Sequence, residues 1–209
     1  MARKRNFRPT SYQIAVIGEG ETEWHYFNNV RTRERFPFSL SPQLPTNSDY
    51  RSIFAKAIQF VKEGWDLIYC VLDTDTIFRS QKLKQDYIKE KKRVTKYTNI
   101  VVIESMPCIE YWFLIHYTGF STKLYPNFKS LQAKLKLHLK GYQKTSKYFK
   151  SINLYKHLTQ TGSLTNAIGI AQRLRHHVKQ NPDIRVSYSD LDLIFQKLHE
   201  ERSKRKSPN

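Results

Sequence analysis

IYCVLDTDTIF, residues 68–78, decides how this chain folds, because an apolar run ends there in two aspartates, Asp73 and Asp75. Runs of roughly four to eight apolar residues are typical of strands that are buried on both faces, as in parallel sheets. YQIAVIGEGETEW, residues 12–24, has the same form, since its apolar run ends in Glu19 and Glu21 around a glycine. The two stretches therefore predict two strands that each deliver a pair of carboxylates to one edge of a sheet.

Strand and helix patterns alternate along the first 119 residues. We expect strands at Tyr12–Ile17, Phe38–Leu44, Asp66–Leu72 and Asn99–Ser105. We expect helices at Glu23–Glu34 with Thr22 as N-cap, Asn47–Gly64 with Ser48 as N-cap, Ser80–Lys96 and Cys108–Gly119. Prolines around the second strand mark it as an edge strand. The alternation predicts an α/β, Rossmann-like fold in which helices flank a mostly parallel sheet.

The remainder of the chain has helical patterns at Phe128–Lys140, Ser163–Val178 and Ser189–Lys204. A change in composition near Phe120 is the candidate domain boundary. We expect residues 1–119 to form the α/β domain and residues 120–209 to form a basic helical region packed on it. The two parts are either separate units or one continuous domain.

Charge is the strongest signal in the composition. The formal net charge is +18, and residues 120–209 carry 18 basic but only 5 acidic side chains. Solubility alone requires much less charge, whereas a segment this basic attracts polyanions. We therefore predict nucleic acid as the partner, ahead of an anionic membrane surface, with Lys144, Lys147, Arg173 and Arg175 as nucleic-acid-binding residues.

The sequence also indicates a compartment. No apolar run approaches the length of about 18 residues that a membrane-spanning helix needs. The basic N-terminus MARKRNFRPTS leads into no signal-type apolar region. Cys70 and Cys108 lie in apolar contexts without disulfide or metal-knuckle spacing, so we interpret both as small buried residues in a reducing cytoplasm. The oligomeric state is left open.

The acidic pairs predict a cation at the sheet edge. In doubly wound sheets, ligands bind outside the carboxyl ends of the strands, where the glutamates and aspartates of the two stretches would meet. Several carboxylates in a poorly solvated cleft require protonation or a cation. One such pair alone would indicate helix caps or turn residues, but two pairs after buried strands favour Mg²⁺, which binds few carboxylates together with phosphate oxygens.

Four stretches together carry a family resemblance: VIGEGETEWHYF, LIYCVLDTD, SMPCIEYWFLIHYTG and GYQKT. The first two resemble the TOPRIM fold of topoisomerases, primases and overcoming-lysogenization-defect nucleases. The third and fourth resemble segments of RloB-like proteins, a bacterial TOPRIM family found near restriction-modification and phage-defence loci. The resemblance covers roughly residues 12–180, and it implies a metal-dependent nuclease.

The resemblance also implies roles for individual residues. Glu19 matches the invariant TOPRIM glutamate, which is a metal ligand or a general acid/base. Asp73 and Asp75 match the DxD that binds Mg²⁺. Glu23 matches the second acid of the EGxxE motif in the nuclease branch. Glu110 matches the glutamate of the PCxEYW segment and is expected close to the site.

Three further residues require separate predictions. Glu21 is extra to the family pattern and either binds metal or faces solvent. His116 is either a hydrogen-bonded, semi-buried histidine or a phosphate donor or proton shuttle. Gly18 stands where these proteins often carry a side chain, a departure that we expect to be harmless.

Together, these patterns predict a Mg²⁺- or Mn²⁺-dependent TOPRIM nuclease that cleaves RNA, tRNA included, or DNA in bacterial anti-phage defence. The alternative is a catalytically inactive nucleic-acid-binding or sensor subunit, working with a defence ATPase. A phosphotransfer enzyme that uses the DxD aspartate as nucleophile is disfavoured, because it needs an aspartate where the first strand ends in Glu19.

Overall fold

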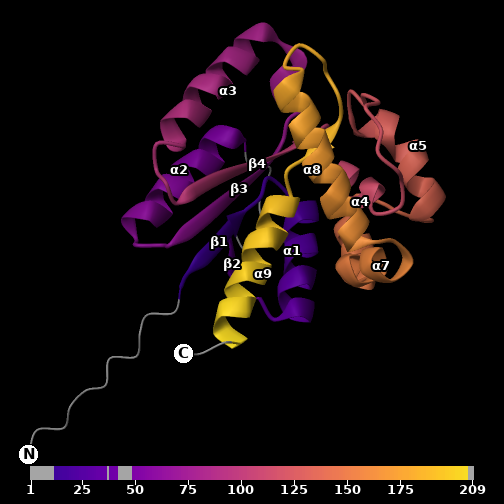
Figure 1. The fold of residues 1–209 in the computed structure, drawn as a ribbon, viewed down its shortest axis with the longest axis horizontal. Helices are drawn as coiled ribbons and strands as arrows, with labels where there is room; N and C mark the ends of the chain where they lie inside the picture. Colours follow the sequence, from indigo (N-terminus) through magenta and orange to yellow (C-terminus); the bar gives the residue numbers. More distant parts are fainter. Residues whose placement is uncertain (1–11, 37, 42–48, 207–209) are drawn as a thin grey trace, which may run out of the picture.

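The computed structural model describes residues 12–36, 38–41 and 49–206. Within these residues, five strands form one sheet in the order β2-β1-β3-β4-β5 (Figure 1). The strands are β1 (Ile14–Ile17), β2 (Phe38–Ser41), β3 (Leu67–Asp73), β4 (Ile100–Met106) and β5 (Tyr188–Ser189). The first four pair in parallel, and β5 pairs antiparallel to β4. The predicted α/β fold with a mostly parallel sheet is confirmed.

Helices follow the strands along the chain. They are α1 (Glu21–Glu34), α2 (Tyr50–Lys62), α3 (Gln81–Val94), α4 (Glu110–Ile115), α5 (Phe128–His138), α6 (Ser146–Ser151), α7 (Leu154–Thr161), α8 (Leu164–Gln180) and α9 (Asp192–Lys206), with a short 3₁₀ turn at Ile77–Arg79. None of the helices in the part of the chain that the structure describes combines the length and apolarity needed to cross a membrane.

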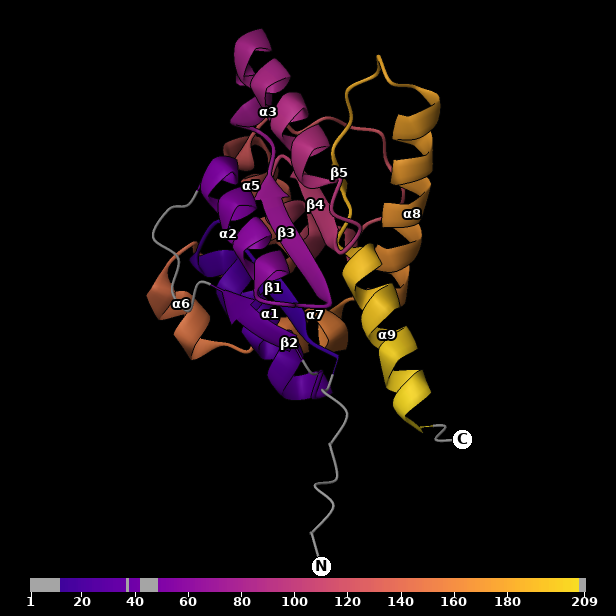
Figure 2. The same cartoon turned by 90° about the vertical axis from the view of Figure 1, so that its left-hand side faces the viewer.

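Helices cover both faces of the sheet (Figures 1 and 2), and a hydrophobic core lies on each side of it. Ala15 and Ile17 point into the core with α2 and α3, whereas Ile14 and Val16 point into the core with α1 and the later helices. Successive side chains of a strand face opposite sides of a sheet, so a strand that is covered on both faces must be apolar throughout. This requirement explains the uninterrupted apolar runs that predicted β1 and β3.

Residues on both sides of position 120 share the larger core. The ring of Trp112 stacks on that of Phe195 in α9, with centroids 5.6 Å apart, and Phe195 in turn stacks on Tyr155 in α7. The indole N–H of Trp112 donates a hydrogen bond of 2.7 Å to the hydroxyl of Tyr26 in α1. The helical region therefore packs directly on the α/β layers.

The starts of α1, α2 and α9 differ from the prediction, and α9 begins at Asp192 rather than at Ser189, which belongs to β5. α1 begins two residues early, and its N-cap is Gly20 rather than Thr22, which is buried inside the first turn. The Glu23 carboxylate accepts a hydrogen bond of 2.9 Å from the Gly20 N–H, so a side chain of the first turn satisfies this backbone donor. α2 is capped by Asp49, which accepts 2.9 Å from the Ser52 N–H. The predicted cap Ser48 lies outside the described residues.

The short elements β5, α6 and α7 and the 3₁₀ turn at Ile77–Arg79 were not predicted from the sequence. β5 has two residues, which is too few to show a period. α6 and α7 are only six and eight residues long. The side chains of Thr145 and Asn153 cap them, and α7 buries Leu154, Tyr155 and Leu158. The strand predicted at Phe38–Leu44 is β2, and the prediction for its last three residues falls outside the described part of the chain.

Candidate metal centre

Three neighbouring parallel strands bring acidic residues to one edge of the sheet. Glu19 follows the end of β1, Asp73 is the last residue of β3, and Glu110 opens α4 after the end of β4. Because β1, β3 and β4 lie side by side in that order, their carboxyl ends lie at the same edge. This is the edge where ligands bind in open α/β sheets.

Asp73 connects the three strand ends. Its backbone N–H donates to the Glu19 Oε1 atom at 3.1 Å. Its own Oδ1 atom accepts from the Ile109 N–H, at the start of α4, at 2.9 Å. The predicted meeting of the acids after β1 and β3 is therefore present, and the loop after β4 joins it.

Glu110 lies at the buried side of this cluster, and its side chain is 0% exposed. Its Oε1 atom accepts from the Tyr142 hydroxyl at 2.9 Å and lies 3.1 Å from the Lys144 Nζ atom. Its Oε2 atom has no hydrogen-bond partner among the described residues. A buried carboxylate oxygen without a partner is costly, so this atom is available to a cation.

Lys144 supplies positive charge to the cluster. Its Nζ atom lies 3.1 Å from Glu110 and 4.0 Å from Asp73, while 42% of the side chain remains exposed. Burial favours the neutral amine, but the negative charges of Glu110, Asp73 and Glu23 outweigh it and raise the pKa of Lys144. The ammonium group therefore stays charged beside the carboxylates and remains within reach of a ligand.

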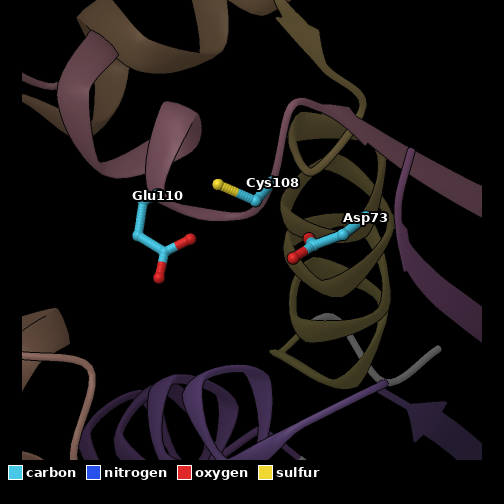
Figure 3. Close-up of side chains that lie close together, drawn as sticks. All are labelled: Asp73, Cys108 and Glu110. Atoms are coloured by element: carbon cyan, nitrogen blue, oxygen red, sulfur yellow. The ribbon is translucent and has the colours of Figure 1, made fainter. Parts of the chain in front are cut away.

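Cys108 belongs to the same cluster (Figure 3). Ligand atoms of Asp73, Cys108 and Glu110 all lie within 4.8 Å of one another, and in Figure 3 the two carboxyl groups point toward each other beside the cysteine. The prediction that Cys108 is buried is confirmed. The apolar residues around it in the sequence did not indicate that it lies beside the Asp73 and Glu110 carboxylates. The signal available in the sequence was its position two residues before Glu110.

These donors fit a divalent cation. The unpartnered Glu110 oxygen and the Asp73 carboxylate are hard ligands of the kind that Mg²⁺ and Mn²⁺ prefer, whereas a thiolate favours softer metals. Burial, followed by the charges of Glu110 and Asp73, raises the pKa of the Cys108 thiol well above its usual value. The oxygen atoms are therefore the ready ligands, and the thiol is a neutral neighbour.

Crowding of the carboxylates favours their protonated forms. Burial, followed by the charge of Glu23, raises the pKa of Glu19 from 4.5 to about 8. Burial also raises the pKa of Glu23, although Lys144 opposes the shift. The pKa of Asp73 is raised well above its usual value by burial and by the charges of Glu23 and Glu110. In the absence of a divalent cation, the raised pKa values favour protonation of these carboxyls, and Lys144 offsets part of the remaining negative charge.

Gly18 leaves room for Glu23. A Cβ atom at position 18 would lie 2.6 Å from the Cβ atom of Glu23, closer than any normal contact. A side chain at position 18 would thus force Glu23, which is buried beside the cluster, to move. Glycine at position 18 therefore fits this structure, and the expectation that the departure from the family pattern is harmless stays a prediction.

Asp75 and Glu21 do not belong to the group formed by Asp73, Cys108 and Glu110. Asp75 is a neighbour of Glu19, whose pKa it raises slightly, and it pairs with Arg79 at 3.3 Å. Glu21 is exposed, and it accepts a hydrogen bond from the Ser146 hydroxyl in α6. Of the two alternatives for Glu21, the structure therefore places it at the surface.

His116 is a buried histidine held by its own helix. Its Nδ1 atom lies 2.9 Å from the Trp112 carbonyl oxygen, so Nδ1 carries the proton and donates it. Burial lowers the pKa of His116 to about 4, which keeps the ring neutral. This agrees with the hydrogen-bonded alternative, with the difference that His116 is fully rather than partly buried.

The predicted nucleic-acid-binding residues differ in their surroundings. Lys147 is exposed on α6, and the guanidinium of Arg173 lies 4.2 Å from the centroid of the Phe120 ring. Arg175 forms two hydrogen bonds, of 2.6 and 2.7 Å, with the Asp192 carboxylate. Its charge is therefore matched within the protein, whereas Lys147 and Arg173 are open to a partner. The binding roles of all four residues, Lys144 included, stay predictions.

Comparison with known proteins gives one match. A family model described as RloB-like protein matches residues 14–198, a segment that contains every residue of the acidic cluster. Searches of curated proteins and of solved structures found no match.

Proposed function

The chain belongs to the RloB-like protein family, and from this premise we propose that it is a metal-dependent nuclease with a TOPRIM-type site. One observation carries the proposal: a fully buried glutamate, Glu110, holds a carboxylate oxygen without a partner beside Asp73, at the carboxyl ends of three neighbouring strands. Such an arrangement binds a divalent cation better than it tolerates free negative charge.

In this proposal Glu19, Asp73 and Glu110 hold the cation, with Asp75 beside them. Bound Mg²⁺ or Mn²⁺ would supply an activated water and charge stabilisation at the scissile phosphate. In the metal-free protein the pKa of Glu19 is raised to about 8, and binding of the cation would displace its proton, so that the ionised carboxylate could serve as a ligand.

Lys144 and Glu23 have supporting roles in the proposed reaction. The exposed part of Lys144 lets its ammonium group donate to a phosphate oxygen while it remains beside Glu110. Glu23, anchored to the Gly20 N–H, holds the start of α1 against the site and keeps Glu19 in position. Both residues order the site before substrate binds, which is where most of the catalytic advantage of such a centre arises.

Nucleic acid is the proposed substrate, because the chain carries a formal net charge of +18 that is concentrated in residues 120–209. RNA, tRNA included, and DNA are both retained, since no described contact selects the 2′-hydroxyl. The proposed role in anti-phage defence, beside an ATPase partner, rests on the family resemblance, and the proposed cytoplasmic location rests on the two cysteines and on the N-terminal sequence.

The decisive experiment is a cleavage assay. Purified protein is incubated with Mg²⁺ or Mn²⁺ and with total tRNA, single-stranded RNA, plasmid DNA or linear DNA. We expect cleavage that EDTA abolishes and that Asp73→Asn reduces by at least about a hundredfold. Asp86→Asn is the matched control, because it changes the same chemical group in an exposed ion pair with Arg51. Equal activity of the two variants would contradict the proposal.

A second candidate follows from Lys144. Its ammonium group, 3.1 Å from Glu110, already supplies one cation to the cluster, as expected of an inactive site in a nucleic-acid-binding or sensor subunit. That protein would bind nucleic acid in EDTA, would not cleave it, and would show no heat of Mg²⁺ binding in calorimetry. Magnesium binding that Asp73→Asn removes would exclude this candidate.

A further inference from the structure

A cleft separate from the metal centre lies between α4, α5 and the segment 117–125. Its volume is about 830 Å³. A second hollow of about 380 Å³ continues along α8, and Phe120 lines both. Tyr111 lines the cleft, and its neighbour Glu110 belongs to the metal centre, so one short helix joins the two sites.

The lining of the two hollows is basic and carries no acid. Among the described residues that line them, Lys123, Lys134 and Arg173 are positively charged, and none is an aspartate or a glutamate. An anionic ligand would thus meet positive charge without opposing negative charge. This complementarity is local, and it adds to the positive charge of the whole helical region.

Flat rings and cations are paired along the cleft. His138 stacks on Tyr117 with ring centroids 5.0 Å apart and an interplanar angle of 6°. The guanidinium of Arg173 lies over Phe120, and the ammonium group of Lys123 lies 5.1 Å from the centroid of the Tyr125 ring. Phe120 is 37% exposed, Tyr117 and His138 are partly buried, and Tyr125 is buried, so Phe120 offers the most ring surface to a ligand. Exposed rings beside cations are the means by which proteins stack nucleobases and contact the adjoining phosphates.

We infer that this cleft binds an unpaired nucleic-acid strand, with bases on the rings and phosphates on the lysines. In a duplex the base faces are covered by stacking, so exposed rings favour an unpaired segment. The inference rests on the proposed function in one respect, namely that nucleic acid is the partner. Since binding is measured in EDTA, where no metal-dependent cleavage occurs, the cleft and the catalytic proposal can fail separately.

Fluorescence anisotropy tests the inference. The full chain is titrated, in EDTA, into labelled oligouridylate or oligothymidylate of about 12 nucleotides. Phe120→Ala should weaken binding about tenfold, because base stacking is lost. Arg173→Lys keeps the charge but removes the planar group, and it should weaken binding about threefold. Circular dichroism melts establish that the variants are folded.

A pair of matched double variants separates the cleft from general attraction. Lys123→Ala with Lys134→Ala removes two charges from the cleft, whereas Lys89→Ala with Lys92→Ala removes two exposed charges from α3. We expect about a tenfold loss for the first pair and less than about twofold for the second.

Three results would overturn the inference. The first is an equal loss for the two double variants, which would show general electrostatic attraction only. The second is unchanged affinity in Phe120→Ala. The third is displacement of the labelled strand by polyglutamate or by a short duplex at the concentration at which the unlabelled strand displaces it.

Discussion

The metal-free protein should become less stable as pH rises, because the folded state holds the Glu19 proton more tightly than the unfolded chain does. The pKa of Glu19 is about 8 in the folded protein, against 4.5 as its ordinary value. Its folded carboxyl therefore keeps a proton that the unfolded chain releases. The stabilisation is fully present below the unfolded value, and it is lost as pH rises through the folded value. At about 1.4 kcal/mol per unit, the loss reaches about 4 kcal/mol near pH 8.

This magnitude is large beside the roughly 5–15 kcal/mol that holds most domains folded. Glu23 and Asp73 also have raised pKa values, so they change stability in the same direction. His116 acts in the opposite direction, since its pKa is lowered to about 4 and its contribution is lost as pH falls. Only a comparison with a variant isolates the effect of Glu19.

The assay is urea unfolding of wild type and Glu19→Gln, in EDTA, near pH 5 and near pH 8. The amide cannot ionise, so the free energy of unfolding of the variant, relative to wild type, should rise between these values by up to about 4 kcal/mol. Adding Mg²⁺ near pH 8 should stabilise wild type more than the variant. Parallel pH profiles for the two proteins would refute the assigned crowding of carboxylates.

Substitutions at Gly18 and at Arg175 test two further contacts. Gly18→Ala should destabilise the protein by about 1–3 kcal/mol in thermal melts, because the added Cβ atom would collide with Glu23. Gly169→Ala is the control: its Cβ atom would meet free space in α8, so it should stabilise the protein by about 0.5 kcal/mol. The same cost at both glycines would contradict the contact. Arg175→Ala should lower the free energy of unfolding by about 2 kcal/mol, because the fully buried Asp192 carboxylate would lose its positively charged partner. Arg175→Lys should recover only part of this free energy. Unchanged stability in urea titrations would show that Arg175 is free to bind a partner.

The strand ends were predictable because each is encoded locally. An uninterrupted apolar run predicts a strand covered on both faces, and parallel strands end at a common edge. Glu19 and Asp73 could thus be placed together from the sequence. Neither the contact of Glu19 with the Asp73 amide nor the sharp rise in the pKa of Glu19 could be read from a pattern, because both depend on how tightly the loops close.

The buried side of the centre depended on long-range packing. Tyr142 and Lys144 reach Glu110 from a segment more than 30 positions later, and no local period encodes such a contact. The resemblance of GYQKT had pointed to this segment, whereas its basic charge had suggested nucleic-acid binding as the role of Lys144. The apolar neighbours of Cys108 in the sequence correctly predicted that it is buried. They did not predict that it lies beside the Glu110 and Asp73 carboxylates.

A crystal structure with Mn²⁺, located by its anomalous scattering, tests the central claim most directly. We predict a manganese peak in bonding contact, at roughly 2.1–2.3 Å, with carboxylate oxygens of Asp73 and Glu110, and with the Lys144 ammonium group displaced from Glu110. A map without a peak there, in which Lys144 keeps its 3.1 Å contact with Glu110 at saturating Mn²⁺, would contradict the claim that these acids form a metal centre.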